Sequence, residues 1–410
     1  MILNEYFYKF LYFKNKTLYL ILLLPISLFI GSTITNLFII LIIILFILES
    51  VQKKYYFFLE KDFYILFAFF IYIILNSIYL TQTSDGIIRA VGFIRFPLLA
   101  YAIAYYFSLE NGRYQNRIIN LWFIIFMITS FDIIFEFFIG FNFIGNTSNY
   151  AGRLASFSGD ELKIGGYYFG FMLISIWIVL KNHKKYYFFF IILFLLSSLL
   201  IGEKANFIKS LFIVSTFLIF IDKNSILKKL SLIGLFVVFA FIFIKSTPAF
   251  NSRFIHHIFN KTEITNYKSL ISSNQHLSHY NTAFEIFKKN PIFGIGIKNF
   301  RNESGDKKYD DLDHFHNTAR FANHPHEIYY EFLSETGIFG FTCFIIFFLI
   351  SISISIKNYL NYKNLYQLSG IIFVIDSLIP ILPSGSFLST YTSSIFWLNY
   401  ALMMGYNIKK

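Results

Sequence analysis

Long apolar runs separated by short polar segments fill most of this chain. Roughly 17–25 mostly apolar residues are enough for a helix to cross a bilayer, and twelve such runs can be placed along the chain. Their predicted extents are 17–33, 34–50, 63–81, 87–107, 118–139, 166–180, 186–201, 207–221, 230–246, 337–356, 366–383 and 391–407. The pattern predicts an all-α fold, a polytopic transmembrane helix bundle of about 12 spans.

Lysine and arginine are concentrated in alternate loops between these runs. The basic segments are 9–16, 53–61, 113–117, 181–185, 223–229, 357–363 and 409–410. The short loops 82–86 and 384–390 contain neither residue. Because cytoplasmic loops carry the excess of Lys and Arg, we expect both termini and all of the basic loops to be cytoplasmic.

This orientation predicts three parts of the chain. Residues 1–246 contain transmembrane helices 1–9, with short outer segments at 140–165 and 202–206. Residues 247–336 form one large helical loop on the outer side, and residues 337–410 contain helices 10–12. Most of the histidines lie in the large loop, so we expect the chemistry of the protein on that side of the membrane.

The composition agrees with an integral membrane protein. Hydrophobic residues make up 56% of the chain and charged residues 14%, against about 25% charged residues in soluble domains. Because the cations follow the loop alternation, the net charge of +12 is a topology signal and does not indicate nucleic-acid binding. The single cysteine, Cys343, excludes an intramolecular disulfide and a cysteine metal site.

Ionisable groups gather at the end of the large loop, in HPHEIYYEFLSETGIFG (324–340). The stretch predicts a helix start, with Asn323 or His324 as the cap and Pro325 at the first helical position. His326 then lies in the first turn, where the helix dipole favours the neutral imidazole that can accept a proton.

His326 is thus a candidate general base, although a histidine at a helix start is often only a capping or packing residue. Glu327 and Glu331 favour the protonated imidazole instead, so the sequence leaves the balance open. Gly337 and Gly340 allow another backbone to approach closely where this helix enters the membrane.

Two further stretches of the loop carry weaker signals. Gly294 and Gly296 form a turn whose N–H groups would suit a phosphate, although such a turn is often only structural. The run YDDLDHFHN contains Asp310, Asp311 and His314, which are suitable ligands for a divalent cation. Short acidic runs are usually solvated, and we predict a site without metal.

The spacing around His326 resembles the signature of the O-antigen ligase and polymerase family of bacterial envelope proteins. In that signature a histidine is followed by Asn, Ser or Gln, nine residues, and Gly-x-x-Gly. Here Glu327 takes the second position, and Gly337 and Gly340 follow after nine residues.

Three other blocks resemble family blocks in the same order. AGRLASFSGDELKIGG contains Arg153, and LIGEKANF carries Lys204 where the family usually has an arginine. HYNTAFEIFKKNPIFGIGIKNFR resembles the helix and Gly-x-Gly turn of the large loop, where Pro291 stops the predicted helix. His276 stands nearest to the position of the family's second arginine.

The resemblance implies a membrane glycosyltransferase of the bacterial inner membrane that acts on the periplasmic side. Its donor would be a glycan on undecaprenyl diphosphate, and its acceptor a sugar hydroxyl of a glycan or of a lipid A core. His326 would be the base, and Glu327 would lie beside the substrate. Lys204 would hold the diphosphate together with a second cation that stays open among Arg153, His276 and Arg301. The family uses no metal or other cofactor.

Alternatives remain at this point. A transporter or flippase of polyprenyl-linked saccharide is the second reading, but the chain shows no convincing internal repeat of the kind that transporters carry. A non-enzymatic envelope scaffold is the third. O-antigen polymerase and O-antigen ligase share the same blocks, and the sequence does not separate them.

Overall fold

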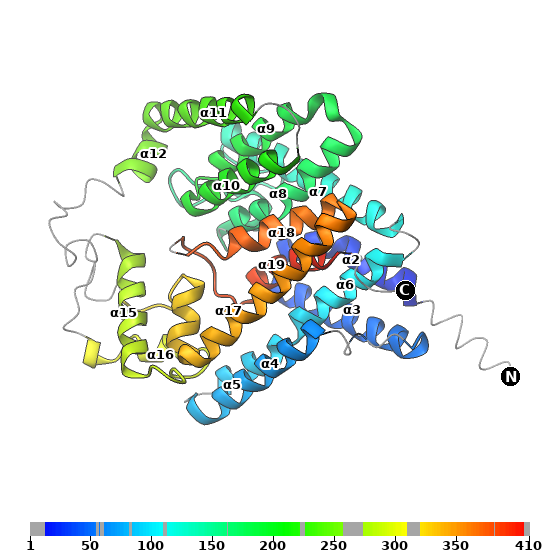
Figure 1. Cartoon of the computed structure of the whole chain (residues 1–410). Coiled ribbons are helices and arrows are strands. Elements are labelled where there is room, and N and C mark those ends of the chain that lie inside the picture. Colours follow the sequence, from blue (N-terminus) through cyan, green and yellow to red (C-terminus); the bar gives the residue numbers. More distant parts are fainter. Residues whose placement is uncertain are drawn as a thin grey trace.

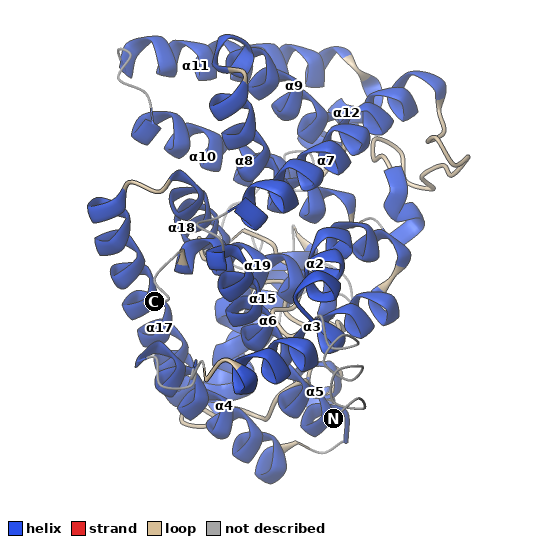
Figure 2. Ribbon diagram, turned by 90° about the vertical axis from the view of Figure 1, so that its right-hand side faces the viewer, coloured by secondary structure: helices blue, strands red, loops and turns tan. Residues whose placement is uncertain are grey.

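A computed structural model describes residues 13–54, 57, 61–81, 84–109, 113–161, 163–221, 226–256, 274–309, 320–380 and 382–405. These residues form helices and connecting loops, with no β-strand among them (Figure 2). The all-α prediction is therefore confirmed for the described part of the chain.

The helices follow the predicted apolar runs. Before the large loop they are α2 (Phe13–Ile30), α3 (Ser32–Gln52), α4 (Lys61–Leu80), α5 (Ser84–Phe93), α6 (Arg95–Ser108), α7 (Arg113–Ile139), α8 (Ile164–Asn182), α9 (Tyr187–Leu200), α10 (Lys204–Ile221) and α11 (Ile226–Ser246). The later helices are α12 (Pro248–Asn251), α15 (Gln275–Lys289), α16 (Phe300–Glu303), α17 (Ile328–Tyr362), α18 (Leu365–Ser377) and α19 (Thr390–Met404).

Eight helical stretches of the described residues are long and apolar enough to cross a membrane. They are Ser32–Gln52, Phe63–Leu80, Ser84–Ser108, Arg113–Ile139, Ile164–Asn182, Lys204–Ile221, Lys229–Ser246 and Ile328–Tyr362. The apolar helices Lys16–Ile30 and Leu365–Ser377 are shorter. The chain is thus a multi-pass helical protein, and the count of 12 spans stays a prediction.

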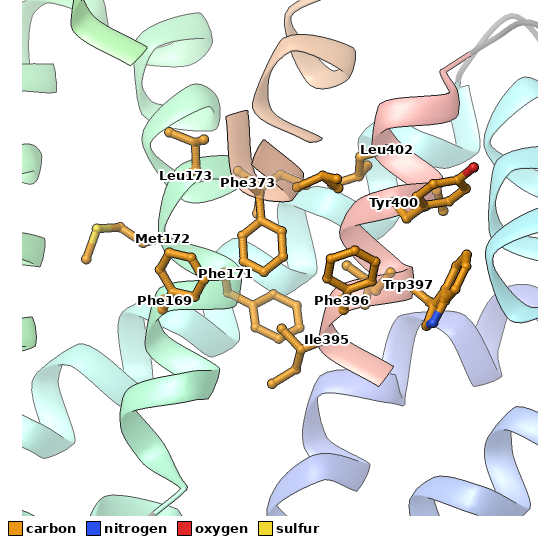
Figure 3. Packing of buried hydrophobic residues seen from close by; sticks show 14 of the residues in the cluster. Phe169, Phe171, Met172, Leu173, Phe373, Ile395, Phe396, Trp397, Tyr400 and Leu402 are labelled. Carbon is orange, nitrogen blue, oxygen red and sulfur yellow. The ribbon is translucent and has the colours of Figure 1, made fainter. Parts of the chain in front are cut away.

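The centre of the bundle is built from α8, α18 and α19, whose buried side chains interlock (Figure 3). The rings of Phe169 and Phe373 lie 4.7 Å apart. Gly170 on α8 allows Ile395 to pack against its backbone, and the Asn399 amide donates to the Gly170 carbonyl over 3.0 Å. In a membrane, close packing at small residues and such interhelical hydrogen bonds hold helices together.

The large loop lies at one end of the bundle. In Figure 1, α15 and α16 lie at the lower left beside one end of α17, which runs diagonally across the bundle, and α12 lies next to α11 at the upper left. The loop has a small hydrophobic core of its own, with Ala283, Ile286, Ile295, Phe300 and Tyr309 as its buried members.

The predicted start of α17 was wrong by several residues. The helix begins at Ile328, and its N-cap is Glu327, whose carboxylate accepts the Tyr330 N–H over 2.9 Å. His326 lies before the cap in a left-handed conformation (φ 63°), and its carbonyl accepts the Ser384 N–H over 2.8 Å. This contact with a distant segment holds the histidine outside the helix, so the helix dipole does not act on it as expected.

Gly337 divides α17 into a short N-terminal part and a membrane-length part. Its backbone is non-helical (φ 64°, ψ −171°). A Cβ at Gly337 would lie 2.3 Å from the Ile292 carbonyl oxygen, so only glycine fits here. The expected close backbone approach at this glycine is confirmed. The break falls at the predicted boundary between the loop and the last transmembrane part, and that domain division stays a prediction.

Candidate active site

Four imidazole rings meet between α15 and the segment before α17. His276 and His279 come from the first turns of α15, and His324 and His326 from the approach to α17. The ring of His326 lies 4.1 Å from that of His324, 5.3 Å from that of His276, and 5.2 Å from that of His279, on which it stacks. His326, predicted as the base, is therefore the centre of a histidine cluster.

Local sequence explains how α15 presents its two histidines. Asn274 caps the helix, because its side chain accepts the His276 N–H over 2.8 Å. The helix ends at Lys289, just before Pro291, as predicted. The ring of Tyr280 stacks on that of Tyr330 at 5.1 Å and joins α15 to the N-terminal part of α17.

Burial keeps the central imidazoles neutral. Desolvation, followed by the neighbouring His324 and His276, lowers the pKa of His326 to about 3, although Glu331 acts in the opposite direction. Desolvation and the charge of Lys298 likewise lower the pKa of His324 to about 3. The sequence left the protonation of His326 open, and the structure favours the neutral form through burial among other imidazoles rather than through the helix dipole.

A buried ion pair near this cluster joins three segments of the chain. Lys298 Nζ lies 3.4 Å from Glu331 Oε1, and the two side chains are 5% and 2% exposed. The Ser386 hydroxyl bonds to both groups, and Phe387 N–H donates to Glu331 Oε2 over 2.8 Å. Glu331, treated above only as a nearby charge, thus ties the segment before α19 to the large loop.

Replacing Lys298 with alanine is expected to destabilise the protein by about 3 kcal/mol, because it leaves the buried Glu331 carboxylate without its cation. Denaturant unfolding of the purified protein measures this loss. Lys307→Ala, at an exposed lysine of the same loop, is the matched control and should change stability little. Equal effects of the two substitutions would contradict the role of the ion pair.

The Gly-x-Gly turn has a structural function. The N–H groups of Ile295 and Gly296 donate to the carbonyls of Ser334 and Glu335 over 3.0 and 2.9 Å, and the Gly294 N–H donates to Asn290. The first two of these bonds satisfy the Ser334 and Glu335 carbonyls of α17, just before its break at Gly337. The suggestion that this turn holds a phosphate is therefore wrong, because its donors are already used.

A second group of charged residues lies at the N-terminal end of α10. The Arg153 guanidinium forms an ion pair with Glu203, and Lys204 is the first residue of α10. Arg253, in the turn after α12, donates from Nε to the Gly202 carbonyl over 2.6 Å. The structure thus places Arg153 and Arg253 near Lys204, and which cations hold a diphosphate stays a prediction.

Two buried carboxylates of α7 fix the segment that carries Arg153. Glu136 accepts the N–H groups of Ala155 and Ser156 over 2.8 and 2.6 Å. Asp132 accepts the Phe143 N–H over 2.7 Å and the Ser156 hydroxyl over 2.6 Å. The segment between α7 and α8 is therefore anchored to α7 on both sides of its turn.

The other predicted substrate residues lie in different surroundings. His276 is part of the histidine cluster. Arg301 pairs with Asp85 at 3.4 Å, and its charge also contributes to the low pKa of His324, so it lies on the side of the histidines. Glu327 caps α17 and is 4% exposed.

Sequence reasoning missed His279, Lys298 and Arg253. It also missed Lys209 on α10 and Asp376 on α18, which are 5% and 4% exposed. Both lie within predicted spans, where an ionisable side chain is itself a signal of function. Nothing comparable marks Lys298 or Arg253, which are cations in a loop rich in charged residues.

The structure does not test the alternative metal site. Asp310, Asp311 and His314 lie outside the described residues. Within the described ranges, no group of three or more His, Cys, Asp or Glu side chains has a geometry that could hold a metal ion. The metal-free site stays a prediction.

Residues 164–345 match the family model described as O-antigen ligase. The matched segment begins with α8, contains Lys204, Arg253 and the four histidines, and ends in α17 beyond Gly340. No curated protein sequence matches the chain.

Proposed function

We propose that this chain, which belongs to the O-antigen ligase family, transfers a glycan from undecaprenyl diphosphate to a sugar hydroxyl on the periplasmic face of the bacterial inner membrane. The observation that carries the proposal is the position of His326, a neutral imidazole at the centre of a histidine cluster inside the family-matched segment. Its acceptor is a glycan or a lipid A core.

The chemistry assigns one role to each group of residues. His326 accepts the proton of the acceptor hydroxyl as its oxygen attacks the anomeric carbon of the donor. The bond to the lipid diphosphate breaks, and the diphosphate leaves with the electron pair. Lys204 with the neighbouring arginines stabilises this leaving charge without a metal ion.

Binding of the anionic donor also changes the pKa of His326. The low pKa of His326 belongs to the site without substrate. A diphosphate bound nearby stabilises the imidazolium form and raises this pKa toward the working pH. Proton acceptance is then favoured only when the donor is present.

The pH dependence of kcat/KM follows from the base. Since the pKa of His326 lies near 3 rather than at its usual 6.5, the free enzyme keeps its neutral base as the pH falls from 8 to 5. We expect kcat/KM for glycan transfer to show no loss near pH 6.5 that belongs to this group. A loss centred near pH 6.5 in the wild-type enzyme that disappears when His326 is replaced would contradict the neutral, buried imidazole.

The proposed orientation places α15, α16 and the histidine cluster outside the cytoplasm. A cysteine at exposed Lys307 should therefore react with a membrane-impermeant maleimide added from the periplasmic side. A cysteine at exposed His183, which ends α8, should react only after the membrane is opened. The reverse labelling pattern would overturn the orientation.

A reconstituted reaction tests the function directly. Purified enzyme in nanodiscs, supplied with lipid-linked repeat units and EDTA, should lengthen or transfer glycan. In the cell, a gene deletion that leaves single repeats on the core indicates a polymerase. A bare core with accumulated lipid-linked glycan indicates a ligase. Movement of the lipid-linked saccharide across the bilayer without transfer would support a transporter instead.

A further inference from the structure

No hydrogen bond within the described part of the chain orients the His326 imidazole. A general base is commonly held by a third group, such as a carboxylate that accepts from its second ring nitrogen. Here the backbone carbonyl of His326, and not its ring, accepts the Ser384 N–H. The χ2 torsion that turns a histidine ring has broad minima, so contacts with neighbouring rings have to set the orientation of this base.

Three imidazoles surround His326, and they meet its ring at different angles. The rings of His276 and His324 are inclined to it by 70° and 44°. The ring of His279 lies nearly parallel to it, at 23° and a centroid distance of 5.2 Å. A parallel neighbour at this distance restricts rotation about χ2, because rotation drives atoms of the His326 ring into the stacked ring.

His279 is itself held firmly. Its side chain is 2% exposed, whereas that of His326 is partly exposed. Asn274 caps α15 before it, and the Tyr280 ring after it stacks on that of Tyr330. Side chains in such close-packed surroundings stay in one rotamer on average. The base therefore has a fixed wall on one side and an accessible side opposite.

We propose that His279 is a positioning residue for the base, and that its buried ring fixes the plane of the His326 imidazole so that a ring nitrogen points toward the acceptor hydroxyl. In this role His279 exchanges no proton and contacts no substrate. A misplacement of about 1 Å can cost about 100-fold in rate, so a contact that only orients the base affects kcat. The inference rests on the proposed function for the identity of the base, but the order of the ring is measurable without glycan transfer.

Two substitutions separate the planar shape of His279 from its bulk. His279→Leu keeps apolar bulk without a plane, and in the full-length enzyme in nanodiscs it should lower kcat for glycan transfer by about tenfold or more. KM should stay near that of the wild type, because the displaced group acts in the transition state. His279→Phe keeps a flat ring that stacks on His326 and should stay within about threefold of the wild-type kcat. Gln275→Leu, at an exposed position in the first turn of α15, is the matched control and should change neither constant.

Solid-state NMR of histidine-labelled protein in lipid bilayers measures the ring directly. The order parameter of the His326 ring should be close to that of rigid backbone, about 0.85, in the wild type. It should fall in His279→Leu and stay high in His279→Phe. If His279→Leu does not fold, the wild-type measurement decides, because a freely rotating His326 ring would overturn the inference by itself.

Equal losses of kcat in the two His279 variants, with the His326 ring ordered in both, would overturn the inference and leave His279 with a structural role. A loss of about 100-fold in His279→Phe, as large as that of removing a general base, would make His279 the proton acceptor and overturn it as well. An ordered ring and normal kcat in His279→Leu, with transfer abolished in His326→Ala, would refute this inference alone. A His326 ring that loses order in His279→Leu, although the wild type transfers no glycan, would refute the proposed function alone.

Discussion

Replacing His326 with alanine should reduce glycan transfer by about 100-fold or more, the usual contribution of a general base. The side chain lies outside the helix and makes no contribution to the cap of α17, which Glu327 supplies. The amount of folded protein in the membrane should therefore remain near normal. Repeat-length distribution on a polysaccharide gel, with membrane protein quantified alongside, measures both effects.

The control for this substitution follows from the structure. His183, exposed at the end of α8, should tolerate alanine. His324 is not a suitable control, because its ring lies 4.1 Å from that of His326. We expect His324→Ala to have an intermediate effect, because it changes the packing that positions the His326 ring. Full activity in His326→Ala with none in His324→Ala would move the base to His324.

Lys204→Ala should lower the rate of transfer by about 100-fold, the typical cost of removing a group that stabilises a developing negative charge. Lys204→Arg should keep most of the activity, since it restores the charge and the residue that the family resemblance places there. The rate of transfer at saturating donor, measured with the reconstituted enzyme, separates this effect from weaker donor binding.

Lys185→Ala is the matched control for Lys204→Ala, because Lys185 is exposed and lies in the basic loop that follows α8. It should leave the rate unchanged. A Lys204→Ala enzyme within threefold of wild type would show that the leaving group is stabilised elsewhere, and Arg301 beside the histidines would become the first candidate.

Predictions that rested on residues close together in the sequence were confirmed. The apolar runs predicted the helices, Pro291 marked the end of α15, and the position of His326 before two glycines indicated the family segment. The first turn of α17 was misread because a contact with a distant segment decides its cap. The sequence offered several possible caps in succession, and the choice of Glu327 depended on the contact between His326 and Ser384.

The sequence by itself determined the helical class, the membrane character and the identity of the central histidine, because each depends on periodicity, composition or spacing within one stretch of chain. Only the tertiary structure decided which groups meet. It placed His276 beside His326, paired Lys298 with Glu331, used the N–H groups of the Gly-x-Gly turn within the protein, and brought Arg253 to Lys204. These contacts join residues tens to hundreds of positions apart, and no local pattern records them.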